Sequence, residues 1–178
     1  MQKTISTLLC TLFMILIMTA CGGSGTVSQT LNSENNVVSD GAEMQTEDSS
    51  LPVRNLPEKG IRIKLRFGDT VIPAVLDRNK TARALIRKLP IKLYMSRFLH
   101  GFSGVIEELP YDPEEVHNRG LNGDINYETN TQNLSILFHD GNISEQNGDW
   151  VNIGVISCPF TTIEELHGSY TVLIELEE

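Results

Sequence analysis

The stretch IRIKLRF, residues 61–67, decides the fold class of this 178-residue chain. Its apolar and basic side chains alternate, which is the period-two pattern of a strand with one face in a core and the other in solvent. The C-terminal stretch YTVLIELEE, residues 170–178, alternates in the same way but carries Glu175 and Glu177 on its polar face. If the two strands pair antiparallel, a basic row faces an acidic row, and each opposed pair contributes a few tenths of a kcal/mol. The first strand of the domain would then meet the last.

Further short strands are expected between these two ends. The stretch GDTVIPAVLD, residues 68–77, supplies a turn and a second strand, so a hairpin is predicted from Ile61 to Leu76. The other predicted strands are IKLYM (91–95), GVIEEL (104–109), GDINYE (123–128), NLSILFHD (133–140) and VNIGVI (151–156).

Two helices are expected among these strands. One runs from Thr81 to Leu89, is capped by Asp77 or Asn79, and ends at Pro90, because proline cannot continue a helix. The other is a short helix in TTIEELHG, residues 161–168, with Thr161 or Thr162 as its cap and Gly168 at its end. Many short strands and a first strand that can meet the last favour a mainly β fold, a closed β-barrel with one clear and one short helix.

The N-terminus has the pattern of an export signal. Residues 1–20 carry a single charge, Lys3, and the apolar run from Leu8 to Met18 is too short to span a bilayer. The run ends in Met18-Thr19-Ala20-Cys21, which resembles the lipobox of bacterial lipoproteins, where the cysteine is lipidated and becomes the new N-terminus. This resemblance implies lipidation at Cys21; the alternative is simple signal cleavage or an uncleaved anchor.

Residues 21–59 are expected to form a flexible acidic tether. From Cys21 to Ser50 there are five acidic residues, no lysine or arginine and no aromatic residue, so this segment cannot bury enough apolar surface to offset its ordering entropy. The stretch LPVRNLPEKG, residues 51–60, is stiffer because of its two prolines. The 119 residues from Gly60 to Glu178 suit one compact domain.

The charge of the chain restricts its partners. A formal net charge of −9 argues against nucleic acid and anionic lipid, so contact with a membrane is expected through the N-terminal lipid only. Between Gly60 and Arg97 there are ten basic and two acidic side chains, whereas Phe98 to Glu178 has one basic and fifteen acidic. Two oppositely charged halves of one small domain are expected to interleave in space.

Cysteine and histidine give no sign of a metal or cofactor site. Cys158 has no intrachain partner once the signal is removed and Cys21 is lipidated, and its apolar setting in VISCPF favours a buried small hydrophobe over a reactive thiol. The four histidines show no paired ligand spacing. No metal and no cofactor are therefore expected.

The order of motifs in the domain resembles the cyclophilin fold, and more closely the bacterial cyclophilin-like domain family of undefined function. The similar segments are the helix start Thr81-Ala82, RFLHGF (97–102), NTQNLSILF (130–138) and NGDWVNIGVI (147–156). The pattern of the bacterial family is matched by Gly123, Asp124, Tyr127, Asn133 and Leu134. These matches stand in the same order across Gly60 to Glu178, and their collinearity carries the resemblance.

The resemblance implies a candidate site. In cyclophilins an arginine holds the substrate carbonyl while the X–Pro bond rotates over a barrier of about 18–20 kcal/mol, and apolar side chains grip the proline ring. Arg97 matches the catalytic arginine, and Phe102 and Phe138 match two phenylalanines of the pocket. Trp150 stands where the family has a histidine at the pocket edge, and it could line a ligand groove or pack as core.

Other positions depart from the cyclophilin pattern. The glutamines that accompany the arginine are replaced by Val105 and Ile136, and the tryptophan position falls near Glu145. The loss of these polar neighbours weakens the preorganised electrostatics on which catalysis depends. The expected function is therefore extracytoplasmic binding of a peptide or small ligand at the bacterial envelope, with a low-activity peptidyl-prolyl isomerase as the alternative and a structural surface module as a third class.

Overall fold

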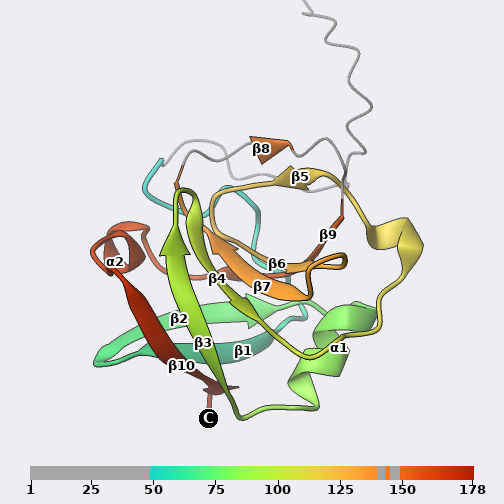
Figure 1. Ribbon diagram of the computed structural model, residues 1–178, viewed down its shortest axis with the longest axis horizontal. Helices are drawn as coiled ribbons and strands as arrows, with labels where there is room; N and C mark the ends of the chain where they lie inside the picture. The colour runs from blue at the N-terminus through green and yellow to red at the C-terminus, as the bar shows by residue number, and fades with distance from the viewer. Residues whose placement is uncertain (1–48, 140–142, 145–148) are drawn as a thin grey trace, which may run out of the picture. The chain divides into compact units, whose positions relative to one another are not determined.

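The structure is a computed structural model that describes residues 49–139, 143–144 and 149–178. Its main feature is a closed antiparallel barrel with the strand order β1-β10-β3-β4-β7-β6-β9-β2 (Figure 1). The barrel strands are β1 (Ile61–Phe67), β2 (Thr70–Leu76), β3 (Ile91–Phe98), β4 (Gly101–Val105), β6 (Asp124–Glu128), β7 (Asn133–Leu137), β9 (Trp150–Ile156) and β10 (Ser169–Leu176). The remaining elements are α1 (Lys80–Ile86), α2 (Thr161–Glu164), the 3-10 turn η1 (Pro113–Glu115) and the two-stranded pair β5 (Arg119–Gly120) and β8 (Ile143–Ser144).

The expected pairing of the first and last strands is confirmed. β1 and β10 are antiparallel neighbours, with Lys64 opposite Glu175 in the register. The basic and acidic rows form ion pairs diagonally: Arg66 Nε lies 2.6 Å from Glu175 Oε1, and Lys64 Nζ lies 3.8 Å from Glu177 Oε1. Such solvent-exposed pairs contribute about 0–1 kcal/mol each, so they fix register more than they add stability.

The inward side chains of the strands fill the barrel. Alternate residues of β1 are buried, as the period-two pattern predicted. At one end of the interior the rings of Phe67 and Phe102 lie 5.0 Å apart, and Tyr170 packs edge-on against both. The mainly β, closed-barrel fold expected from the sequence is therefore confirmed.

Both helices form, but their boundaries differ from those expected. Asn79 caps α1, and its side chain accepts a hydrogen bond of 2.8 Å from the amide of Ala82. α1 ends at Ile86, three residues before Leu89, and the amides of Lys88 and Leu89 then donate to carbonyls three residues back, in a tighter turn that leads to Pro90. α2 begins after Phe160 without a side-chain cap, so the predicted capping by Thr161 or Thr162 is wrong.

The fourth strand also departs from the prediction. β4 begins at Gly101 and ends at Val105, whereas a strand was expected over 104–109. Its two glycines allow neighbouring backbones to approach: a Cβ on Gly104 would lie 2.3 Å from the carbonyl oxygen of Tyr94. Because a glycine interrupts each face of β4, at positions 101 and 104, the strand has no apolar alternation that a sequence pattern could reveal.

The chain before Gly60 is packed against the barrel, which corrects the C-terminal end of the expected tether. The amide of Val53 donates to the carbonyl of Asn122 at 2.8 Å, and the amide of Phe160 donates to the carbonyl of Ser50 at 2.8 Å. Pro52 lies against Gly123, since a Cβ added to Gly123 would lie 2.5 Å from the Cβ of Pro52. The predicted signal peptide of residues 1–20, Cys21 and the tether up to residue 48 lie outside the described residues. Within the described residues, no helix has the length and apolarity needed to cross a membrane.

Candidate functional site

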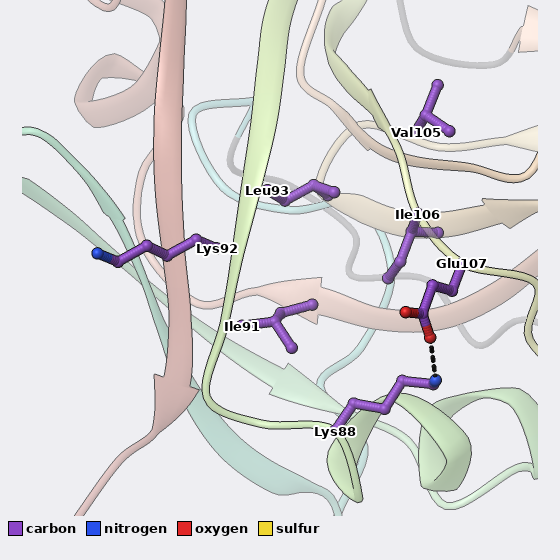
Figure 2. A pocket seen from close by; sticks show the side chains of 7 residues that line it. All are labelled: Lys88, Ile91, Lys92, Leu93, Val105, Ile106 and Glu107. Carbon is purple, nitrogen blue, oxygen red and sulfur yellow. Dashed lines mark hydrogen bonds and ion pairs between the residues drawn. The ribbon is translucent and has the colours of Figure 1, made fainter.

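The candidate site is a gap in the barrel wall between β3 and β4. The two strands pair only through Ser96–Ser103, Arg97–Phe102 and Phe98–Gly101, although β3 continues back to Ile91. Toward α1 the strands diverge and leave an open pocket of about 440 Å³ (Figure 2). This volume lies within the range of small-ligand pockets, about 300–1,000 Å³.

The pocket has apolar walls. Ile91 and Leu93 point from β3 toward the segment that carries Val105 and Ile106 (Figure 2). Leu93 and Ile106 are buried, whereas Val105 is 70% exposed. The pocket therefore offers a protected apolar floor and one apolar side chain at its rim.

An ion pair spans the end of the pocket next to α1. Lys88 Nζ donates to Glu107 Oε2 at 2.6 Å and so connects the residues after α1 with those after β4 (Figure 2). The hydrogen bond from Lys88, reinforced by its positive charge, lowers the pKa of Glu107, so this carboxyl is ionised at neutral pH. Lys92 also lines the pocket, but its side chain leads away from the other lining side chains in Figure 2, so it contributes mainly backbone.

Arg97 lies outside this pocket and binds the end of α2. Its Nη1 donates to the carbonyl oxygens of Glu164 and Leu166, at 2.8 and 2.5 Å. The guanidinium carbon also lies 5.1 Å from the ring centroid of Phe138, within the range of a cation–π contact. These contacts satisfy backbone carbonyls that the short helix leaves unpaired. Catalysis by Arg97 stays a prediction, and the guanidinium has a structural role in the described conformation.

Phe102 and Phe138 pack against each other, and the Phe138 ring also contacts Arg97. Their ring centroids are 5.9 Å apart, and both side chains are fully buried. The rings fill the core and present no face to solvent in this conformation. Their predicted role in binding is untested.

Trp150 lies apart from these three residues, at the start of β9. It is buried, and its backbone exchanges two hydrogen bonds with His117, of 2.9 and 3.0 Å. A Cβ on Gly120 would lie 2.4 Å from the Trp150 ring, so the residues before β6 cover the indole. Packing was one of the two roles considered for this side chain, and the structure shows it; a role in ligand binding stays a prediction.

A buried ion pair was missed by the sequence analysis. Arg54 Nε and Nη2 donate to the two carboxylate oxygens of Asp124 at 2.8 and 2.9 Å, and the amide of Leu121 donates to Asp124 Oδ2 at 3.0 Å. Asp124 is 0% exposed and Arg54 is 9% exposed. The only signal was the match of Gly123-Asp124 to a family pattern, which gave no indication of a partner 70 residues away.

Cys158 is buried, as expected, and desolvation raises the pKa of its thiol, although a hydrogen bond with Thr162 acts in the opposite direction. In the part of the chain that the structure describes, no three His, Cys, Asp or Glu side chains come together as a metal site would require.

Residues 65–175 match the sequence pattern described as the cyclophilin-like family. The chain belongs to the cyclophilin-like family. The cyclophilin-like domain also resembles a hypothetical protein from Archaeoglobus fulgidus whose structure was solved in solution, with a TM-score of 0.54 and 20% identity over 67% of this chain and 98% of the archaeal one. At this identity the likeness concerns the fold alone. Comparison with curated proteins gives no match.

Proposed function

We propose that this protein is an envelope-anchored, extracytoplasmic binding module of a bacterium, and that its cyclophilin-like domain holds a peptide or small ligand in the gap between β3 and β4. The observation that carries the proposal is the pocket itself, in which a buried apolar floor is bordered by the Lys88–Glu107 ion pair. Ligand pockets typically combine apolar walls with a few polar groups that orient the ligand. Binding of a ligand in this way does not require these residues to make or break covalent bonds.

Support for the location comes from the sequence. The apolar run before Met18-Thr19-Ala20-Cys21 and the acidic segment that follows are the pattern of a lipid anchor and a spacer. Lipidation at Cys21 would leave the domain on the outer side of the membrane. Incorporation of a labelled fatty acid that is lost in Cys21→Ser tests this part of the proposal.

The isomerase alternative has one observation in its favour, since Arg97 lies beside Phe138, as the cyclophilin pattern requires. Two observations favour binding. The guanidinium already donates to the carbonyls of Glu164 and Leu166, and Phe102 and Phe138 are buried. A substrate proline could pack against these rings only if they became exposed to solvent, and they are buried in the described conformation.

Two assays on the full chain in mild detergent test the proposal. The first follows the fluorescence of anilinonaphthalene sulfonate, an apolar anion, in the wild type and in Ile91→Trp, which fills the pocket. Leu99→Trp is the matched control, because Leu99 is an exposed residue at the β3–β4 turn and does not line the pocket. We expect saturable binding that Ile91→Trp weakens at least tenfold and Leu99→Trp leaves unchanged; equal binding by all three would refute a ligand site in the gap.

The second assay measures cis/trans exchange of a short X-Pro peptide. The binding proposal predicts no acceleration by the intact chain. Acceleration that disappears in Arg97→Ala would instead establish the isomerase alternative.

A further inference from the structure

The ion pair at the end of the pocket joins two residues with different surroundings. Lys88 lies in the turn after α1, where its amide donates to the carbonyl of Leu85 at 2.9 Å, and its side chain is 37% exposed. Glu107 lies beyond the end of β4, and its side chain is 81% exposed. Ion pairs between exposed side chains contribute little to stability, so the carboxylate can move into solvent at small cost while the lysine remains at the pocket.

The charges of the two walls favour an anion in the position that Glu107 would vacate. From Arg78 to His100, a range that includes the turn after α1 and all of β3, the sequence holds seven lysine and arginine residues and no acidic residue. Glu108, the acidic neighbour of Glu107, does not line the pocket. A carboxylate on Lys88 therefore competes only with an exposed side chain. An ammonium on Glu107 would have to displace the more enclosed Lys88 and would lie next to a basic segment of the chain.

The rest of the pocket accommodates an apolar body. Leu93 and Ile106 are buried and form the floor, and Val105 is exposed at the rim. The remaining charged side chain of the lining, Lys92, leads away from the other lining side chains (Figure 2). A ligand that is complementary to these walls has an apolar part over the floor and one negatively charged end at Lys88.

We propose that the ligand of this pocket is a molecule with an apolar chain and a terminal carboxylate. Its chain lies over the apolar floor, and its carboxylate replaces that of Glu107 as the partner of Lys88. Glu107 then acts as an internal competitor, which holds the cation while no ligand is bound and turns outward when the ligand enters. This inference rests on the proposed binding function, and it names the class of ligand.

Three probes with the same six-carbon chain and different end groups test the class of ligand: hexanoate, hexanol and hexylammonium. Binding is followed by the methyl signals of Ile91, Leu93, Val105 and Ile106 in the full isotope-labelled chain in mild detergent, and micelles without protein correct for uptake of the probes by the detergent. We expect hexanoate to shift these signals saturably. Because only hexanoate carries a charge opposite to that of Lys88, we expect it to bind at least about threefold more tightly than either of the other two probes.

Two variants of the ion pair have opposite predicted effects. Lys88→Gln removes the cation, so we expect it to abolish the preference for hexanoate over hexanol. Glu107→Gln removes the competing carboxylate, so we expect it to raise the affinity for hexanoate about threefold. If the pair were only a structural link between the walls, both substitutions would change hexanoate binding in the same direction. Arg62→Gln is the matched control, because it removes a positive charge from an exposed ion pair on β1 and should leave hexanoate binding unchanged.

A carboxylate on an apolar chain occurs both in free acids and at the C-terminus of a peptide. The peptide acetyl-Leu-Leu with a free C-terminus and its C-terminal amide distinguish these two sources. If the free peptide binds more tightly than hexanoate and the amide does not, the source is a peptide C-terminus. If hexanoate binds more tightly, the source is a free acid. Both results support the proposed class of ligand.

The other outcomes separate this inference from the function on which it rests. Equal binding of hexanoate and hexanol by the wild type would overturn the proposed class of ligand, as would a preference for hexanoate that survives in Lys88→Gln. If either result is found and the anilinonaphthalene probe still binds in the gap, the class of ligand is wrong and the binding function stands. If neither that probe nor any six-carbon probe binds in the gap, both proposals fail. The comparison of probes uses the unaltered chain, so it is decisive whatever the stability of the variants.

Discussion

The substitution Arg54→Ala gives the sharpest test of the packing described for the N-terminal segment. It removes the two hydrogen bonds that Arg54 donates to Asp124, whose carboxylate is 0% exposed and also accepts a hydrogen bond from the amide of Leu121. Removal of one partner from a buried ion pair costs about 3–5 kcal/mol, because the other charge stays desolvated. Against a total stability of about 5–15 kcal/mol for a domain, this is a large fraction.

Urea unfolding followed by circular dichroism measures the effect. Arg66→Ala is the matched control, because Arg66 also forms a short ion pair, with Glu175 at 2.6 Å, but its side chain is 43% exposed. Exposed pairs contribute about 0–1 kcal/mol, so we expect the midpoint to fall far more for Arg54→Ala than for Arg66→Ala. The double variant Arg54→Met, Asp124→Leu should recover part of the loss, since it leaves no unpaired charge. Equal midpoints for Arg54→Ala and the wild type would refute the buried pair and the packing of this segment.

Three further predictions concern the barrel itself. Gly104→Ala should destabilise the domain by about 1–3 kcal/mol in urea unfolding, because its Cβ would lie 2.3 Å from the Tyr94 carbonyl oxygen; Gly104→Ala with wild-type stability would contradict this close approach. Ser135→Ala should be neutral or stabilising by up to about 1 kcal/mol, since Ser135 Oγ is buried and has no hydrogen-bond partner among the described residues, and a loss above about 1 kcal/mol would reveal a further bond to this hydroxyl. Burial raises the pKa of the Cys158 thiol, and only the thiolate reacts, so alkylation with iodoacetamide should be slow at pH 8 and should rise at higher pH than for an ordinary cysteine. The same chain in urea should react at the ordinary pH, and an identical pH profile in the folded and urea-unfolded chain would show that the thiol is accessible.

The sequence pattern was sufficient to predict an element where apolar and polar residues alternate along a strand, or where a helix begins at a capping residue. The alternation in residues 61–67 and 170–178 predicted the two strands and their pairing because both faces of each strand have distinct chemistry. Asn79 was one of two caps considered for α1, and its position at the start of the apolar helical repeat made it a candidate. Each of these features depends on residues that are close in sequence.

The gap and the buried ion pair depend on contacts that no local pattern encodes. The end of the β3–β4 pairing depends on where two backbones diverge, and the side chains there are ordinary strand residues. Arg54 lies in a stretch whose composition is typical of turns and linkers. Its partner Asp124 is 70 residues away in the sequence, and the two come together only in the folded chain. The role of Arg97 was open for the same reason, because its two carbonyl partners belong to a segment about 70 residues later in the chain.

The pairing of β1 with β10 also sets the order of events when the chain is made. Arg66 and Glu175 are 109 residues apart, so the barrel cannot close until almost the whole domain has been synthesised. Contacts of such long range make folding slow, and until they form, one edge of β1 has no neighbour. The polar face of β1 carries Arg62, Lys64 and Arg66, and these charges repel a second copy of the same strand. The charges that fix the register of the closed barrel therefore also protect the unpaired strand from aggregation before the barrel closes.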